Sequence, residues 1–289
     1  MTTLARLALA CLAVSVGVTG LSCTTASASV VTRASGFPIS NENSIIVSDD
    51  KGTDPGQVNE IAIGLAPDFP DDYRITDTGG IQGQMPELCI RESGNSVRCS
   101  TSAPAGSNPD PQQVNRIFVA LGGGDDTFSV LDPRGIPEDV LLEVEGGPGN
   151  DTIWGRKGGG REILRGDRVD ENESPVGPFG DDTLITGAPE DGKVLDGGGG
   201  NDVIVIIVNS QTRSFMAAKS SRFGLLLGGA GNDRLTGGPG RDRMKGGPGR
   251  DRLKGRGGND IIDCGGGKHD LGVGGGGVDL GKNCEKVKH

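Results

Sequence analysis

Aspartate recurs in this chain at a fixed distance behind a cluster of glycines. Residues 228–263 divide into units of nine, with Asp at the sixth position of each: GGAGNDRLT, GGPGRDRMK, GGPGRDRLK and GRGGNDIID. Glycine permits positive φ and tight turns, which point carbonyl oxygens inward. The aspartate adds a carboxylate to them. The resulting all-oxygen set suits a hard cation such as Ca²⁺.

The pattern also occurs upstream. Units at 146–154 and 197–205 fit in full, and units that begin at Leu121 and Gly177 fit with one glycine replaced. The candidate metal ligands are the aspartates of these units and the first glycines of the units that open on Gly-Gly: Asp126, Asp151, Asp182, Asp202, Asp233, Asp242, Asp251, Asp260, Gly146, Gly197, Gly228, Gly237 and Gly246. Calcium takes about six to eight oxygens, so a second turn must complete each shell.

This repeat resembles the nonapeptide of the RTX (hemolysin-type) calcium-binding family, written G-G-x-G-x-D-x-U-x with U a large apolar residue. The resemblance covers most of residues 117–284. It implies an all-β fold, a right-handed parallel β-roll in which two units make one coil and Ca²⁺ lies between successive turns. Units nine residues apart would alternate sides and units eighteen apart would stack. Asp233 and Asp251 would then share one column, and Asp242 and Asp260 the other.

Short strands must position these turns. The three residues after each aspartate form a strand whose middle residue faces inward, because strand side chains alternate. These inward residues are all apolar: Phe128, Ile153, Leu184, Ile204, Leu235, Met244, Leu253 and Ile262. Val144, Leu195 and Leu226 keep the same phase without a full motif. Residues 157–164 read as a degraded unit with Glu for Asp, and 132–139, 166–176 and 208–223 read as extruded loops.

The composition leaves little for an ordinary hydrophobic core. Of 289 residues, 53 are glycine, and only 33% are apolar and 3% aromatic. Burying an aliphatic side chain contributes about 1.5–3 kcal/mol, whereas ordering each backbone residue costs about 1–2 kcal/mol. Ion coordination must therefore offset the difference, and a net charge of −10 attracts cations. A flexible low-complexity chain is the alternative that composition alone leaves, but the glycines recur in phase.

Targeting signals favour an extracellular location. Residues 1–28 read as a secretory signal peptide, with Arg6, an apolar run and the small residues 26–28 before the cleavage point. A lipid anchor at Cys23 is the alternative. No later apolar run is long enough to span a bilayer. Four cysteines then remain in an oxidising compartment, and the favoured of three connectivities is local, Cys89 with Cys99 and Cys264 with Cys284.

We expect three regions after the signal peptide. Residues 29–116 form an N-terminal β segment, which serves as a cap and ends in a flexible linker around 100–112; a separate globular domain is the alternative. Residues 117–263 form the roll with its loops. Residues 264–289 form a disulfide-closed C-terminal cap, because an open solenoid end exposes unpaired strand edges.

No motif in the chain indicates catalysis. It contains no His-Glu-x-x-His and no Gly-x-Ser-x-Gly, and only two histidines. A secreted hydrolase that uses paired acids such as Asp71 and Asp72 is a weaker alternative. We therefore expect a non-enzymatic, monomeric protein whose cofactor is Ca²⁺. Nucleic-acid binding is not expected, since aromatic residues that stack on bases are scarce.

Adhesion is the second functional hypothesis. Arginine follows the aspartate in three tandem units, at Arg234, Arg243 and Arg252, with Lys245, Arg250, Lys254 and Arg256 nearby. Like charges in one outward stripe repel unless an anion lies between them. An anionic cell-wall or surface polymer is the partner that such a stripe would bind, and a solvated surface that offsets the aspartates is the simpler explanation.

Overall fold

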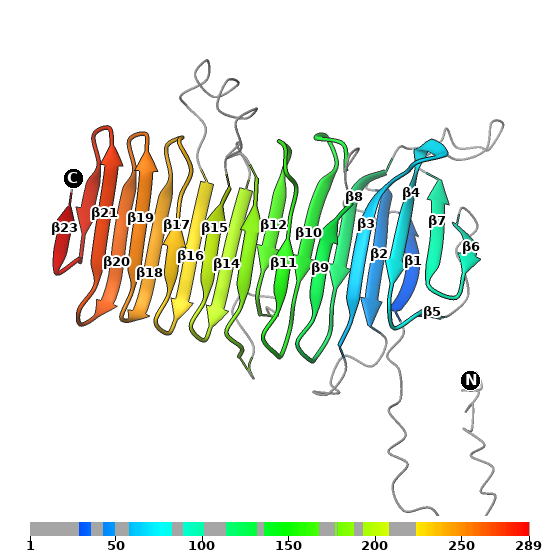
Figure 1. The fold of residues 1–289 in the computed structure, drawn as a ribbon, viewed down its shortest axis with the longest axis horizontal. Coiled ribbons are helices and arrows are strands. Elements are labelled where there is room, and N and C mark those ends of the chain that lie inside the picture. The colour runs from blue at the N-terminus through cyan, green and yellow to red at the C-terminus, as the bar shows by residue number, and fades with distance from the viewer. Residues whose placement is uncertain are drawn as a thin grey trace, which may run out of the picture.

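Short strands stack along one axis into an elongated two-sheet roll, with the N-terminal strands at one end and the C-terminal strands at the other (Figure 1). The computed structural model describes residues 29–35, 43–49, 58–82, 89–100, 114–131, 136–167, 177, 179–187, 193–207 and 224–288. The expected signal peptide, Cys23, nearly all of the expected linker and most of the expected loops lie outside these residues. Within the described ranges no helix is long and apolar enough to cross a membrane.

Consecutive strands of the roll alternate between the two sheets. Sheet 1 contains β1 Ser29–Ser35, β2 Asn43–Asp49, β5 Ile81–Gln82, β8 Val114–Ala120, β10 Leu141–Glu145, β12 Glu162–Arg165, β14 Lys193–Gly199, β16 Gly224–Ala230, β18 Arg243–Gly249, β20 Ile261–Gly267 and β22 Leu280–Lys282. Sheet 2 contains β3 Glu60–Ala66, β4 Phe69–Asp77, β6 Cys89–Ser93, β7 Ser96–Ser100, β9 Thr127–Val130, β11 Thr152–Trp154, β13 Thr183–Thr186, β15 Val203–Ile206, β17 Arg234–Thr236, β19 Arg252–Gly257, β21 Leu271–Gly276 and β23 Lys286–Lys288.

Parallel pairing sets the register of the roll. In sheet 2 Leu235 pairs with Leu253, and in sheet 1 Met244 pairs with Ile262, so units eighteen residues apart stack. The predicted all-β roll of parallel strands and its register are confirmed. We call the turns that lead from sheet 1 to sheet 2 forward turns and those that lead back return turns.

The N-terminal strands continue both sheets. β2 runs parallel to β8, and β3 runs parallel to β9, which makes them a rung of the roll. Antiparallel strands follow outside them, with β1 on β2 and with β4, β7 and β6 beyond β3. The predicted disulfide between Cys89 and Cys99 joins β6 to β7.

The predicted inward residues are confirmed. Each is at most 2% exposed, and together they form one continuous hydrophobic cluster between the sheets. They are Phe128, Ile153, Leu184, Ile204, Leu235, Met244, Leu253 and Ile262, with Val144, Leu195 and Leu226 in the same phase.

The apolar core narrows towards the C-terminus. In each of the first three rungs, β2–β3, β8–β9 and β10–β11, at least one strand buries two large apolar side chains, as in β3 with Ile61 and Ile63 and in β10 with Leu142 and Val144. In the C-terminal half β17 buries Leu235 alone. The turns must therefore contribute more to the stability of the last rungs than to that of the first.

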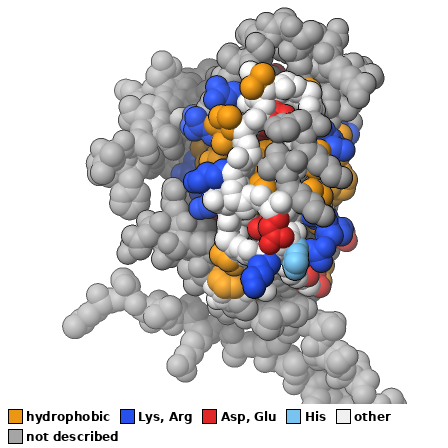
Figure 2. All heavy atoms as spheres, turned by 90° about the vertical axis from the view of Figure 1, so that its left-hand side faces the viewer, with side chains coloured by type: hydrophobic (Ala, Val, Ile, Leu, Met, Phe, Trp, Pro, Cys, Tyr) orange, Lys and Arg blue, Asp and Glu red, His pale blue; other side chains and the backbone are white. Residues whose placement is uncertain are grey.

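A second predicted disulfide, between Cys264 and Cys284, joins β20 to the segment after β22. Seen from this end, the surface is largely backbone and small side chains, with lysine and arginine side chains on both flanks (Figure 2). Val278 and Leu280 are strongly exposed in the last turn. The disulfide thus closes the final rung, although apolar side chains there stay in contact with solvent.

Candidate cation sites in the turns

The aspartates of the repeats form two ladders along the roll. In each ladder one carboxylate oxygen accepts a hydrogen bond from the backbone N–H of the aspartate one turn earlier. In the forward turns these N to Oδ1 distances are 2.8 Å for Asp126 to Asp151, Asp151 to Asp182 and Asp182 to Asp202, and 2.9 Å for Asp202 to Asp233, Asp233 to Asp251 and Asp251 to Asp270. In the return turns they are 2.9 Å for Asp242 to Asp260 and 3.0 Å for Asp260 to Asp279.

The structure therefore separates the predicted ligands into two columns. Asp233 and Asp251 lie in one column and Asp242 and Asp260 in the other, as the repeat register predicts. Asp126, Asp151, Asp182 and Asp202 all join the column of Asp233. The forward turns thus carry a long unbroken series, whereas in the return turns the described aspartates that join a ladder all lie near the C-terminus.

The second carboxylate oxygen of most of these aspartates is buried without a hydrogen-bond partner. Such an oxygen is costly in a protein interior unless something compensates its charge. Among the described residues, the buried Oδ2 atoms that lack a partner belong to Asp151, Asp182, Asp202, Asp233, Asp251, Asp260 and Asp279. Each of these atoms is placed to receive a ligand that the polypeptide itself does not supply.

In the units that open on Gly-Gly, the first glycine keeps the space beside this oxygen free of a side chain. A Cβ built on Gly228 would lie within 3.0 Å of both Asp233 Oδ2 and Gly246 O, the latter at 2.7 Å. A Cβ on Gly246 would meet Asp251 Oδ2 and, at 2.6 Å, Cys264 O. A carboxylate oxygen and a carbonyl oxygen of the next turn therefore flank the same small volume. The equivalent Cβ atoms on Gly146, Gly197 and Gly237 would meet the same two kinds of atom.

Positive φ angles explain the other glycines of the unit. Gly229 has φ 101° and Gly231 has φ 143°, and a Cβ on either would run into the carbonyl oxygen of the turn before. An L-residue pays a steric cost in this region of φ. Glycine therefore allows successive turns to stack closely enough to share oxygens.

Burial raises the pKa of the ladder carboxyls. Desolvation, with a smaller contribution from neighbouring carboxylates, raises the pKa of Asp151 to about 8 and that of Asp182 to about 9. The same main cause raises the pKa of Asp202 to about 8 and of Asp260 to about 7. Without a bound cation these groups hold protons near neutral pH, and a cation must displace them.

Asp242 differs from the other predicted ligands. Its Oδ1 accepts a hydrogen bond from Gly224 N at 3.1 Å, and its Oδ2 accepts one from Gly238 N at 2.7 Å. Burial raises its pKa to about 6. Its carboxylate is thus partly satisfied by the backbone, which makes its role as a metal ligand weaker than that of Asp233.

The sequence reasoning missed three members of the ladders. Asp270 is 2% exposed and accepts from Asp251 N, but its unit carries one extra residue, so the nine-residue template passes over it. Asp279 lies in the segment GGGGVD, where Gly281 stands at the inward position in place of a large apolar residue, and it completes the return ladder. Asn59 starts the forward ladder, because its N–H donates to Asp126 Oδ1 at 2.5 Å.

A third ladder, which is exposed to solvent, runs beside the forward turns. The residue before each aspartate accepts a hydrogen bond through its side chain from the backbone N–H of its counterpart one turn later. Its members are Asp125, Asn150, Asp181, Asn201 and Asn232. The recurrent Asn-Asp and Asp-Asp pairs were the signal for it in the sequence. This ladder aligns the turns without occupying the space beside the first glycines.

The expected arginine stripe is wrong in one respect. Arg234 pairs with Arg252 in sheet 2, but Arg243 lies in sheet 1 between Leu225 and Ile261. The three residues are nine apart, and such units alternate between the sheets. Arg234 on β17 and Arg252 and Lys254 on β19 therefore belong to sheet 2, whereas Arg243 and Lys245 belong to β18 of sheet 1.

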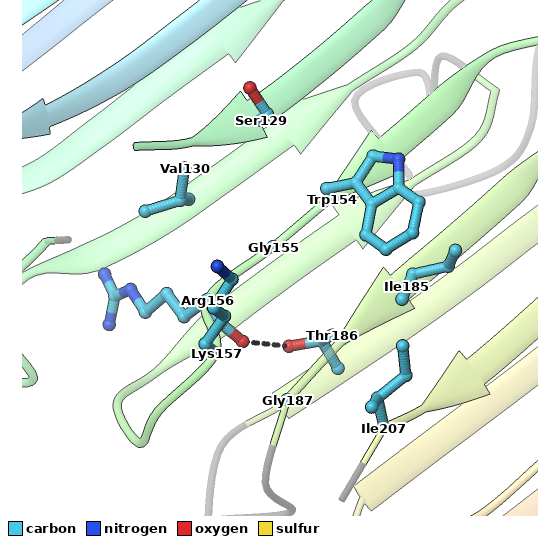
Figure 3. A pocket seen from close by; sticks show the side chains of 10 residues that line it. All are labelled: Ser129, Val130, Trp154, Gly155, Arg156, Lys157, Ile185, Thr186, Gly187 and Ile207. Carbon is cyan, nitrogen blue, oxygen red and sulfur yellow. Dashed lines mark hydrogen bonds between the residues drawn. The ribbon is translucent and has the colours of Figure 1, made fainter. Parts of the chain in front are cut away.

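A recess of about 540 Å³ on the outside of sheet 2 is separate from the ladders. Figure 3 shows Trp154, Ile185 and Ile207 on one side of it, with the Arg156 side chain turned away from the indole. Arg156 is 3% exposed, and its guanidinium donates to Val140 O. Among the described residues that line this recess there is no Asp, Glu, His or Cys.

The donor set of the turns fits a hard divalent cation. No group of three or more His, Cys, Asp or Glu side chains gathers anywhere in the described part of the chain. A cation in the turns would instead take one carboxylate from each turn and complete its shell with backbone carbonyls. Oxygen-only coordination of that kind favours Ca²⁺ over zinc or the other transition metals.

Comparison with known proteins identifies the repeat. The family model of the RTX calcium-binding nonapeptide repeat matches in four copies, over residues 143–168, 194–205 and 236–268. These ranges contain the turns of Asp151, Asp202, Asp242, Asp251 and Asp260. Neither a search of curated proteins nor a search of solved structures gives a match.

Proposed function

Since this chain carries RTX calcium-binding nonapeptide repeats, we propose that it is a secreted, non-catalytic structural protein whose forward turns bind Ca²⁺ and whose roll folds as the ions bind. One observation carries the proposal. Buried Oδ2 atoms without hydrogen-bond partners recur turn after turn, each beside a glycine that leaves space and a carbonyl oxygen of the next turn. Asp151, Asp182, Asp202, Asp233 and Asp251 are the proposed carboxylate ligands of the forward turns.

Calcium availability supports an extracellular role. Extracellular calcium modules bind with Kd of about 10⁻⁴–10⁻³ M, which matches the millimolar calcium outside cells. The two disulfides are also typical of an oxidising compartment. The C-terminal rungs of the metal-free chain would stay unfolded before export and fold afterwards. The non-catalytic assignment rests on the lack of a catalytic motif in the sequence.

Calcium binding to paired aspartate variants tests the proposal. Replacing Asp233 and Asp251 by asparagine keeps an oxygen that can accept the ladder hydrogen bonds but removes two carboxylate charges. We expect calcium binding at these turns to weaken on the order of tenfold or more, because affinity follows ligand charge. Isothermal titration calorimetry on the secreted chain measures the number and affinity of sites.

Asp263→Asn is the matched control. Asp263 carries the same charge but lies outside the ladders, where Asn283 and Lys282 contact its carboxylate. Its replacement should leave the number of bound calcium ions unchanged. Equal calcium binding by the wild type and the Asp233→Asn/Asp251→Asn variant would contradict the proposed sites.

A second candidate function is adhesion to an anionic surface polymer. Arg234 and Arg252 lie side by side in sheet 2, both exposed, and neither forms an ion pair within the described residues. Directly opposite like charges are destabilising, which an anionic ligand would relieve. We expect Arg234→Glu/Arg252→Glu to reduce retention on purified cell wall, while Arg243→Glu on the other sheet does not. Equal retention of both variants would exclude this surface.

A further inference from the structure

The return ladder of aspartates stops in the middle of the roll. Followed from the C-terminus, its positions are occupied by Asp279, Asp260 and Asp242. The next position in register is Gly224, whose N–H donates to Asp242 Oδ1. Beyond it the same position is taken by Lys193 and then by Glu162, which pair with each other across β14 and β12.

Lys193 and Glu162 form an ion pair in the interior. Both side chains are 0% exposed, and Lys193 Nζ lies 2.8 Å from Glu162 Oε2. The ammonium also donates to Thr186 Oγ1 at 2.8 Å and to Gly158 O at 3.2 Å. A carboxylate, a hydroxyl and a backbone carbonyl therefore surround one positive charge. This set of oxygens is of the kind that the other turns present to a divalent cation.

The carboxylate of this pair occupies the same place as a ladder aspartate. A Cβ on Gly155, the first glycine of its turn, would meet Glu162 Oε1, just as a Cβ on Gly228 would meet Asp233 Oδ2. Glu162 Oε1 also accepts a hydrogen bond from Arg156 N at 2.9 Å. The turn therefore keeps the glycine that the repeat has at this position, but the longer side chain of Glu162 fills the space beside it.

We propose that Lys193 is a built-in cation that takes the place of calcium between these two return turns. The site does not fit a divalent ion, because an ammonium already fills the space among its oxygens and neutralises Glu162. A buried charge pair holds only while both partners are present, since either one alone is left uncompensated. β12 and β14 are therefore joined on this side without metal.

This inference rests on the proposed function in one respect only: it compares the Lys193 site with the turns that are proposed to bind calcium. The contacts of Lys193 stand without any ion. Glu162 and Lys193 lie between the N-terminal rungs, in which at least one strand buries two or more apolar side chains, and the rungs of β16 to β19, in which each strand buries one. The built-in cation would thus extend the metal-independent part of the roll as far as β14.

Lys193→Met tests the proposal in the full secreted chain. Methionine keeps an unbranched side chain that is one atom shorter than lysine, but removes its charge and its hydrogen bonds. In excess chelator we expect β12 and β14 of the wild type to stay protected from amide hydrogen exchange, and the variant to exchange on the order of tenfold faster or more there. Lys254→Met, on the outer face of sheet 2, is the control and should not change this exchange.

Two further variants separate charge compensation from packing. In Glu162→Gln/Lys193→Met no buried charge remains, so protection of β12 and β14 should partly return relative to Lys193→Met alone. Lys193→Asp places two acids in consecutive turns, and these strands should then become protected only with calcium. Unchanged exchange in Lys193→Met, or no recovery in the double variant, would overturn the proposal. If the wild type bound no calcium at all, the proposed function would fail while the Lys193→Met result in chelator would still decide this inference.

Discussion

Removing calcium should unfold the C-terminal rungs of the roll before the N-terminal ones. β16 and β17 together form a rung that buries one apolar residue in each strand, Leu226 and Leu235, whereas β3 and β10 each bury at least two, so the late rungs depend most on ions between the turns. At about 1 mM calcium and a Kd of about 10⁻⁴ M, each site contributes about 1.4 kcal/mol. One such site for each of the five proposed ligands of the forward turns would add about 7 kcal/mol, comparable with the whole stability of a typical domain.

Hydrogen exchange resolved along the sequence measures this gradient, with circular dichroism for total β structure. In chelator, amides of β16 to β21 should exchange rapidly, while those of β2, β3 and β8 stay protected. Restoring calcium should reverse the change. Uniform protection in chelator along the whole roll would mean that the ladder carboxylates do not depend on metal.

Lowering the pH should partly compensate for the removal of calcium from the roll. The folded-state pKa values of Asp151, Asp182 and Asp202 lie at about 8 to 9, well above the ordinary value of 3.8. A raised folded pKa gives stability that is fully present below the unfolded pKa and is lost as the pH rises through the folded pKa. The metal-free roll should therefore be more stable near pH 5 than near pH 9. A metal-free chain with the opposite trend would contradict the burial of these carboxyls.

Gly228→Ala should strongly weaken both calcium binding and folding. Its new Cβ would lie within 3.0 Å of Asp233 Oδ2 and Gly246 O, in the space proposed for the ion. Overpacking alone costs about 1–3 kcal/mol, and the lost ion adds to that cost. We expect a clear drop in the midpoint of thermal unfolding in calcium and fewer bound ions by titration.

Gly266→Ala is the matched control for this substitution. Neither glycine has a positive φ, so backbone strain is the same for both, but a Cβ on Gly266 would meet nothing within 4 Å. Alanine there should be neutral or slightly stabilising, because it reduces the freedom of the unfolded chain. Equal effects of the two substitutions would show that the space beside Gly228 is not a binding site.

The phase of the repeat predicted most of the fold and of the candidate site. Leu235 and Met244 were assigned to the interior from their place after the aspartate, and both are buried. The spacing of Asp233 and Asp251 predicted one column. The physical reason is that each nonapeptide is a complete unit of turn and strand, so local sequence determines both the inward residue and the position of the carboxylate.

Features that depend on neighbouring rungs were harder to predict. The role of Lys193 could not be read from its own surroundings, because its partner Glu162 is 31 residues away and loops intervene. Asp270 was missed because an extra residue breaks the nine-residue count. Arg243 was grouped with Arg234 because sequence proximity suggested a shared face, whereas alternation between sheets separates them.

The forward ladder has a direction. Its first member, Asn59, is neutral and donates its backbone N–H to Asp126. Every later aspartate accepts a hydrogen bond from the backbone N–H of the preceding turn. Each finished rung is thus a template for the rung that follows it in the chain. A polypeptide that crosses a membrane N-terminus first can accordingly assemble vectorially, one coil at a time, at the pace at which it emerges.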